Sequence, residues 1–224
     1  MIKVLIVDDH ALFRAGLRLI LKEQDQIEVV GEAESGEEAL KQAKQLMPDI
    51  CLMDLQMPHG MGGIEATRRI LRLLPSCRVI ALTVLGDDPF PSQLREAGAM
   101  GYLTKGCPAD ELVKAVRLVA GGRPYIDSTV AQARMLADWQ GGTASPFTEL
   151  SSREFQVTLM ILDGRRTQDI SDTLSLSPKT VSTYRQRIYD KLGVHTDVDL
   201  TRLAFRYGLI SDQPGGAATG HGGG

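Results

Sequence analysis

The chain has 224 residues, of which 43% are hydrophobic and 24% charged, and its formal net charge is −3. These proportions exclude a wholly disordered or fibrous chain, and the length indicates one large domain or two small ones. No apolar run approaches the roughly 18 residues that a membrane span needs, and the apolar run after Met1 is too short for a signal peptide. We therefore expect a cytoplasmic protein. Cys51, Cys77 and Cys107 show no metal or redox spacing, so we expect buried or half-buried thiols.

The first half of the chain alternates between short apolar runs and amphipathic segments. Apolar runs predict strands, and apolar positions at helical spacing predict helices. Five strand–helix units then imply an α/β domain over 1–121: a doubly wound (βα)5 parallel sheet of the flavodoxin-like type, with helices on both faces. The strands are expected at 3–7, 28–33, 50–54, 78–83 and 100–104, and the helices at 11–22, 36–46, 62–74, 88–97 and 109–120.

The second half carries no strong strand pattern and predicts a four-helix all-α domain over 147–211. Ser151 followed by Glu154 is a capping-box sequence, and Pro178 suits a first helical position. Helices are expected at 151–162, 167–174, 178–192 and 197–207. Residues 122–146 are expected to form a linker that could hold a short helix over 128–139, with flexible chemistry near its end. The Gly- and Ala-rich tail, 212–224, is expected to be disordered.

Polar residues follow several strands of the predicted sheet. Asp8 and Asp9 follow the first strand, Asp54 ends the third, Thr83 ends the fourth and Lys105 follows the fifth. In an open parallel sheet, these strand ends meet in one crevice. Converging carboxylates stay ionised when a cation neutralises them, and hard oxygen ligands suit Mg²⁺. The sequence therefore predicts a magnesium-dependent acidic pocket.

Phosphoryl transfer is the chemistry that this pocket would serve. Asp54 is the best-placed nucleophile, because a carboxylate can accept a phosphoryl group as an acyl phosphate. The metal would be held by Asp9, Asp54 and the backbone carbonyl of Gln56, with Asp8 acting through a metal-bound water. Lys105 would add positive charge and Thr83 a hydroxyl donor at the phosphoryl oxygens. Each residue alone is more often a cap or a surface residue, so the prediction depends on their common placement at strand ends.

Residues 7–10, 52–58, 81–83 and 101–105 resemble the motifs of a bacterial response-regulator receiver domain, and the resemblance spans about 1–121. It implies phosphorylation of Asp54 by a sensor histidine kinase. It also implies a switch between Thr83 and Tyr102, in which the hydroxyl moves towards the phosphoryl group and the ring turns inward. Many receivers have proline after the lysine, with a cis peptide, whereas this chain has Gly106, so the resemblance does not by itself imply a cis bond there.

The helix expected over 178–192 is amphipathic. Val181, Ile188 and Leu192 fall on one stripe at about 3.6 residues per turn, which predicts a core face. The opposite face is polar and basic, and it carries Lys179, Ser182, Thr183, Gln186 and Arg187. A solvated surface helix would show the same pattern. A short preceding helix and a tight turn favour instead the recognition helix of a helix-turn-helix that binds double-stranded DNA.

Residues 150–154, 169–170, 176–181 and 188–192 resemble a DNA-binding domain of the LuxR/NarL (FixJ) type, and several departures from the broad pattern resemble the GacA/UvrY subgroup. By position, Ser182, Thr183 and Gln186 are expected at base edges. The residues expected at phosphates or otherwise in the DNA-binding set are Thr167, Lys179, Thr180, Tyr184, Arg185 and Arg187. The resemblance further implies a homodimer when phosphorylated and activation of small regulatory RNA genes.

The leading hypothesis is thus a phosphorylation-controlled transcription regulator rather than an enzyme. One alternative is an aspartyl-phosphate hydrolase, which would release phosphate repeatedly, and another is a helical domain that binds a protein instead of DNA. Val198, Phe205 and Leu209 could form a dimer stripe or belong to the core, and the core interpretation is favoured because apolar helix positions usually face inward.

Overall fold

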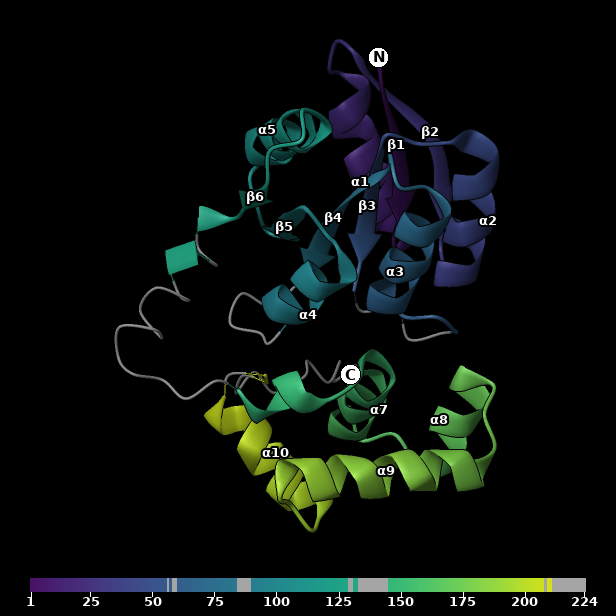
Figure 1. The fold of residues 1–224 in the computed structure, drawn as a ribbon, viewed down its shortest axis with the longest axis vertical. Helices are drawn as coiled ribbons and strands as arrows, with labels where there is room; N and C mark the ends of the chain where they lie inside the picture. Colours follow the sequence, from purple (N-terminus) through teal and green to yellow (C-terminus); the bar gives the residue numbers. More distant parts are fainter. Residues whose placement is uncertain are drawn as a thin grey trace, which may run out of the picture.

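The computed structural model describes residues 1–55, 57, 60–83, 90–128, 131–132, 145–207 and 209–210, with the backbone alone for 90–93 and 152. Gln56, most of the helix expected over 128–139, the expected flexible stretch up to 144 and the tail from 212 lie outside these residues. Two domains are seen in Figure 1, a sheet with helices on both sides and a smaller all-helical unit. Within the described part of the chain, no helix combines the length and apolarity that crossing a membrane requires.

The first domain is built on a six-stranded sheet with the order β2-β1-β3-β4-β5-β6, and every neighbouring pair is parallel. The strands are β1 (Ile2–Val7), β2 (Ile27–Ala33), β3 (Ile50–Asp54), β4 (Arg78–Thr83), β5 (Gly101–Thr104) and β6 (Tyr125–Ile126). Five strands lie within one residue of the expected bounds, which confirms the α/β class. Strand β6 was not predicted, because a strand of two residues is too short to show a period.

Five helices cover the sheet: α1 (Ala11–Lys22), α2 (Gly36–Leu46), α3 (Gly63–Leu73), α4 (Phe90–Ala97) and α5 (Ala109–Ala120). Side chains of a strand alternate between its faces, so Val4 and Ile6 pack with α1 and α5. Leu5 and Val7 pack with α2 and α3 on the other face. Gly62 and Leu74, expected inside the third helix, are its caps, positions that are only half helical.

The second domain begins with a short 3₁₀ helix, η1 (Pro146–Glu149), which was not predicted. Four helices follow, α7 (Ser152–Leu162), α8 (Thr167–Leu174), α9 (Pro178–Leu192) and α10 (Asp197–Arg206). The Ser151–Glu154 capping box is present, and Gly193 ends α9 in the left-handed conformation. The core interpretation holds for Leu209 but is wrong for Val198 and Phe205, which are 58% and 45% exposed, because no other described residue covers the face of α10 that carries them.

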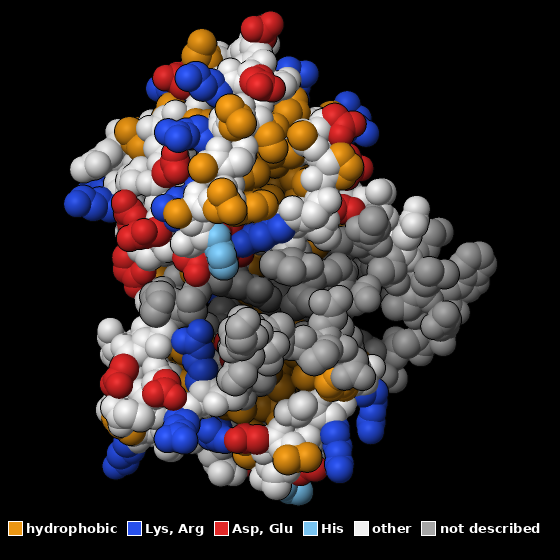
Figure 2. Space-filling view, turned by 180° about the vertical axis from the view of Figure 1, so that it is seen from behind, with side chains coloured by type: hydrophobic (Ala, Val, Ile, Leu, Met, Phe, Trp, Pro, Cys, Tyr) orange, Lys and Arg blue, Asp and Glu red, His pale blue; other side chains and the backbone are white. Residues whose placement is uncertain are grey.

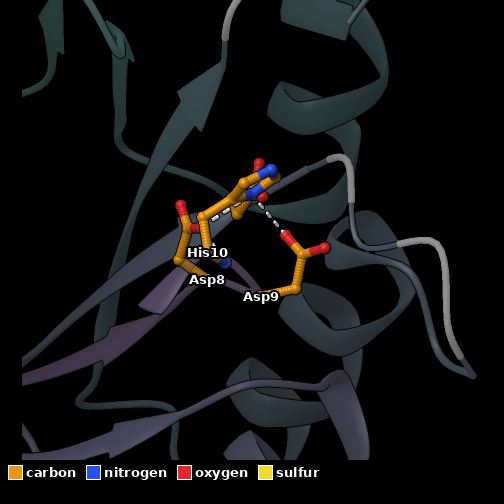
Figure 3. Close-up of side chains that lie close together, drawn as sticks. Asp8, Asp9 and His10 are labelled. Atoms are coloured by element: carbon orange, nitrogen blue, oxygen red, sulfur yellow. Dashed lines mark hydrogen bonds and ion pairs between the residues drawn. The ribbon is translucent and has the colours of Figure 1, made fainter. Parts of the chain in front are cut away.

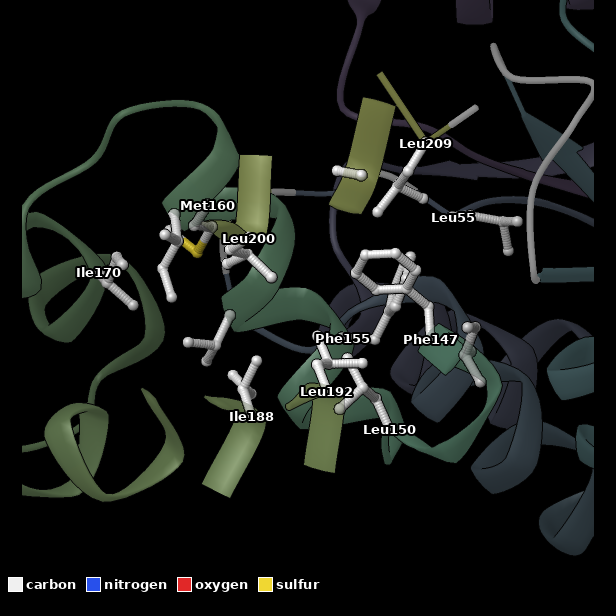
Figure 4. Close-up of a cluster of buried hydrophobic side chains, with 14 of the residues drawn as sticks. Leu55, Phe147, Leu150, Phe155, Met160, Ile170, Ile188, Leu192, Leu200 and Leu209 are labelled. Carbon is white, nitrogen blue, oxygen red and sulfur yellow. The ribbon is translucent and has the colours of Figure 1, made fainter. Parts of the chain in front are cut away.

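A continuous cluster of buried side chains joins the two domains (Figure 4). It runs from Leu55 and Tyr102 of the sheet domain to Phe147 of η1 and Phe155 of α7. Phe147 is fully buried, and burying an aromatic side chain of this size contributes on the order of 2 kcal/mol. The segment at the start of the helical domain is therefore fixed against the sheet domain, although its flanking sequence resembles a flexible linker.

Candidate functional site

Four potential metal ligands meet where β1 and β3 end. The register of the two strands pairs Val7 with Met53, so Asp8 and Asp54 follow side by side. One ligand atom each from Asp8, Asp9, His10 and Asp54 lies within 4.8 Å of the others. Figure 3 shows Asp8, Asp9 and His10 turned towards one another, with the His10 Nδ1 atom 2.8 Å from Asp9 Oδ1. The predicted acidic pocket is thus present as a spatial cluster.

Lys105 extends into this cluster from the segment after β5. Its Nζ atom lies 2.7 Å from Asp8 Oδ2 and 2.9 Å from Asp54 Oδ2. Both carboxylates are fully buried, and buried charges are costly unless they are paired. Burial of the Lys105 ammonium opposes its charge, but the attraction of Asp54 and Asp8 outweighs this and raises the lysine pKa. The pocket therefore keeps a fixed positive charge beside Asp54.

The backbone around the pocket is closely packed. A Cβ atom at position 63 would overlap the carbonyl oxygen of Asp54, so only glycine lets α3 begin directly against the end of β3. Asp8 Oδ1 accepts a hydrogen bond from the His10 backbone at 2.8 Å, and the Asp8 carbonyl accepts one from Arg14 at 2.6 Å. These contacts hold the acidic side chains in fixed positions.

The pocket's donor set fits a small divalent cation. Carboxylate oxygens are the ligands that Mg²⁺ prefers in proteins, and three carboxylates meet one lysine in this pocket, so a further positive charge would reduce their mutual repulsion. Asp8, Asp9 and Asp54 are the described residues that could hold the ion. The expected fourth contributor, the carbonyl of Gln56, lies outside the described part of the chain.

Thr83 ends β4, and Tyr102 lies in the neighbouring strand β5. Both residues are buried. The Lys105 backbone donates to the Thr83 carbonyl at 2.6 Å, which places Thr83 beside the pocket. Tyr102 belongs to the buried cluster that reaches Phe147 of the helical domain. An aromatic residue near the pocket therefore shares its packing with the second domain.

A shallow apolar groove lies on α1 next to the pocket. It is lined by Leu12, Phe13 and Ile20, among others, and by His10 and Lys105. The Lys105 Nζ atom also lies 5.0 Å from the centre of the Phe13 ring. Figure 2 shows apolar side chains gathered on this domain, close to a histidine and to a basic side chain. An apolar partner surface could thus bind within reach of the acidic cluster.

The amphipathic pattern of α9 is confirmed. Val181, Ile188 and Leu192 are buried. The exposed face carries the residues expected there, namely Lys179, Ser182, Thr183, Gln186 and Arg187. In Figure 1, α9 lies on the side of the helical domain that faces away from the sheet. A polar, basic helix face is therefore open to solvent.

Several polar side chains of α9 are already hydrogen-bonded. The hydroxyls of Ser182 and Thr183 each donate to the backbone carbonyl four residues earlier, at 3.0 Å. The Gln186 amide donates to Asp190 Oδ1 at 2.9 Å. One of the two amide hydrogens of Gln186 therefore already has an acceptor within α9.

Other residues of the expected set lie at the edges of this face. Thr167 begins α8, Thr180 lies in the first turn of α9, and Tyr184 lies beside the core stripe; all three are partly buried. Arg185 forms an ion pair with Asp197 of α10. Its guanidinium therefore has an internal partner, which the sequence did not indicate.

Hydrogen bonds between the domains were also not predicted. The Gly60 carbonyl accepts from Arg153 Nη1 at 3.1 Å and from Gln156 Nε2 at 3.3 Å. The Gly60 N–H donates to the Thr173 carbonyl at 3.3 Å. These contacts join α7 and α8 to the segment that follows Asp54. No sequence pattern could have found them, because they link residues about a hundred positions apart.

The comparisons with known proteins agree with this architecture. A model of the response regulator receiver domain matches residues 4–117, and a model of the bacterial regulatory proteins of the luxR family matches residues 148–204. The chain therefore belongs to the two-component response regulators that carry a LuxR-type DNA-binding domain. The expectation of a transcription regulator rather than an enzyme is confirmed by this membership.

The relatives cover almost the whole chain. Response regulator GacA of Pseudomonas protegens is 51% identical over 210 residues, which span 94% of this chain and 98% of that protein. Response regulator UvrY of Escherichia coli is 49% identical over 212 residues, which span 94% of this chain and 97% of that protein. Among solved structures, RcsB from Salmonella enterica serovar Typhimurium, bound to promoter P1flhDC in the presence of phosphomimetic BeF3−, is 27% identical with a TM-score of 0.68. That match covers 90% of this chain and 97% of the RcsB chain.

Proposed function

We propose that this response regulator is switched by a phosphoryl group on Asp54, which a sensor histidine kinase donates. The observation that carries the proposal is the fully buried Asp54 carboxylate, 2.9 Å from Lys105 Nζ and clustered with Asp8 and Asp9. An Asp54 oxygen attacks the phosphorus of a phosphohistidine. A P–O bond forms, the P–N bond breaks, and the electron pair returns to the imidazole, which takes a proton from solvent.

The other pocket residues have supporting roles in this proposal. Asp9, Asp54 and the backbone carbonyl of Gln56 would hold Mg²⁺, with Asp8 beside them, and the ion would offset charge on the phosphoryl oxygens. Lys105 attracts the same oxygens as a positive point charge. The kinase would bind over the apolar groove of α1, which opens next to Lys105.

The signal would pass from Thr83 to Tyr102 and then to the helical domain. The Thr83 hydroxyl would turn towards the new phosphoryl group, and Tyr102 would move into the space beside it. This route is supported by the packing of Tyr102, since its cluster continues to Phe147 of η1. A change at Tyr102 therefore alters packing at the boundary between the domains.

The output would be binding of double-stranded DNA by α9. Ser182, Thr183 and Gln186 lie on its exposed face and would contact base edges. The side chains that would contact phosphates are Lys179, Thr180, Tyr184, Arg185 and Arg187, with Thr167 at the start of α8. The exposed Val198 and Phe205 of α10 lie two turns apart and would be covered by a second copy of the chain on DNA.

The proposed targets are small regulatory RNA genes. This part rests on the resemblance to the GacA/UvrY subgroup, whose named members share about half of their residues with this chain. Footprinting of the phosphorylated chain on genomic DNA would identify the sites. Footprints confined to other gene classes would contradict this target assignment and leave the rest of the proposal intact.

The acceptor role is tested by labelling the full chain from a radiolabelled small phosphodonor with Mg²⁺. We expect about one hydroxylamine-sensitive acyl phosphate per chain, because a receiver stores the group rather than turning it over. Asp54→Asn should abolish the label, whereas Asp25→Asn, which removes an exposed acid, should retain it. Full labelling of Asp54→Asn would refute the assignment.

A further inference from the structure

The start of the linker is bound to the edge of the sheet as strand β6. Tyr125 pairs with Gly101 and Ile126 with Tyr102 of β5. The Tyr125 N–H donates to the Met100 carbonyl at 3.0 Å, and the Asp127 N–H donates to the Tyr102 carbonyl at 2.9 Å. The linker is thus joined by its backbone to the strand that carries the proposed aromatic switch.

Asp127 adds a side-chain contact at the end of this strand pair. Its carboxylate is 2% exposed, and Oδ2 accepts hydrogen bonds from the Thr104 backbone N–H at 3.2 Å and from the Thr104 hydroxyl at 2.7 Å. A buried carboxylate is costly unless it accepts such bonds, and charge-assisted bonds are the stronger kind. Asp127 therefore holds Thr104 in place.

Thr104 immediately precedes Lys105. On the other side of this junction, the Lys105 N–H donates to the Thr83 carbonyl at 2.6 Å. The backbone that carries the Lys105 side chain into the acidic pocket is therefore held by β4 on one side and by Asp127 on the other. None of the residues in the proposed function belongs to the linker.

We propose that Asp127 is a positioning residue for phosphoryl transfer to Asp54, acting through Thr104 and Lys105, and that it couples the linker to the acidic pocket. The inference rests on the proposed acceptor role of Asp54. Small displacements of a positioning group reduce the rates of reactions that depend on orientation. We also expect Asp127 to stabilise the occupied pocket, and because an equilibrium coupling between two sites is reciprocal, occupation of Asp54 then changes how firmly β6 is held.

The test measures phosphoryl uptake by the full chain from acetyl phosphate with Mg²⁺. Asp127→Ala should slow uptake about tenfold. Asp127→Asn retains a side-chain oxygen that can accept from Thr104, so it should recover most of the rate. Asp110→Asn, which removes an exposed acid at the start of α5, should leave the rate unchanged. Thermal unfolding of every variant separates a loss of rate from a loss of fold.

Thr104→Val provides an independent variant, since it removes the hydroxyl with little change of shape. It should slow uptake, and the double variant Thr104→Val/Asp127→Ala should be no slower than Asp127→Ala alone, because both changes break the same contact. An Asp127→Ala variant that takes up phosphoryl groups as fast as the wild type would overturn the positioning role. So would a double variant in which the two reductions in rate add. Equal slowing of the Asn and Ala variants in step with lost stability would also overturn it.

The same experiment distinguishes this inference from the proposed function. Suppose that the wild-type chain takes up the phosphoryl group, Asp54→Asn does not, and Asp127→Ala does so at the wild-type rate. This result contradicts the positioning role alone. A wild-type chain that takes up no phosphoryl group contradicts both. Hydrogen exchange of 125–127 should also change when beryllofluoride is added to the wild-type chain, and unchanged exchange would contradict the reciprocal coupling.

Discussion

The Lys105 ammonium lies 2.9 Å from the Asp54 carboxylate, and this contact predicts how the stability of the pocket responds to loss of the lysine charge. Lys105→Gln leaves Asp54 and Asp8 buried beside each other, and an unpaired buried charge costs about 3 kcal/mol. We expect a lower free energy of unfolding without Mg²⁺ and a larger gain on adding Mg²⁺ than in the wild type. Chemical denaturation at several Mg²⁺ concentrations measures both, with Lys41→Gln on α2 as the exposed control. Equal Mg²⁺ responses of variant and wild type would contradict the prediction.

A second prediction concerns the buried Glu154 of α7. Burial opposes its charge, but hydrogen bonds from Lys191 and Ser151 outweigh this and lower its pKa. A lowered carboxyl pKa contributes stability above the unfolded value, about 4.3, and this contribution is lost as the pH falls through the folded pKa. Glu154→Gln should therefore destabilise the chain by about 1–3 kcal/mol at pH 7. The difference in the free energy of unfolding between variant and wild type should become smaller below about pH 4. Urea unfolding across this pH range tests it.

The exposed Glu149 provides the matched control for this measurement, because only its backbone carbonyl contacts Lys191. Glu149→Gln should follow the wild-type pH dependence. If Glu154→Gln lowers the free energy of unfolding by the same amount at every pH, the charge of Glu154 is not what stabilises α7.

The domain contact gives a third prediction. Arg153→Ala removes the donor to the Gly60 carbonyl across the domain boundary and a second one to the Leu174 carbonyl within the helical domain. A hydrogen bond from a charged group is worth about 1.5–3 kcal/mol. The population of chains with separated domains should rise about tenfold. Small-angle scattering of the unphosphorylated chain would detect this as a larger radius of gyration, with Arg206→Ala as the control. An unchanged radius would show that the apolar cluster and the remaining hydrogen bonds of Gly60 hold the domains together without Arg153.

A fourth prediction separates two kinds of DNA contact on α9. Gln186→Ala should lower the ratio of specific to non-specific affinity, because a lost base contact costs about 1–3 kcal/mol at the cognate site only. Lys179→Ala should weaken binding to all sequences alike and reduce the salt slope by about one. Fluorescence anisotropy over a range of salt concentrations distinguishes the two. An unchanged affinity ratio would remove Gln186 from the proposed base-reading set.

The sequence predicted the sheet and the pocket because strand periods and strand-end residues are local signals. Asp8, Asp54 and Lys105 follow from counting residues to the ends of apolar runs. The contacts of Arg153 and Asp127 could not be predicted, since each depends on a partner far along the chain or on a strand of two residues. The internal partners of Gln186 and Arg185 were missed for a related reason, because a helical wheel places a side chain on a face but does not say what it binds there.

The orientation of α9 bears on how DNA access is controlled. The hydrogen bonds described between the domains come from α7 and α8. Helix α9 lies on the side of the helical domain away from the sheet (Figure 1), and its polar residues are exposed. Within the described residues, this arrangement would let a duplex approach that face, as the proposed function requires, while both domains stay in contact. If α9 reads DNA as proposed, unmasking of the reading surface would not be a prerequisite for the first encounter with DNA, and a phosphoryl group on Asp54 would act on a later event, such as the pairing of two bound chains.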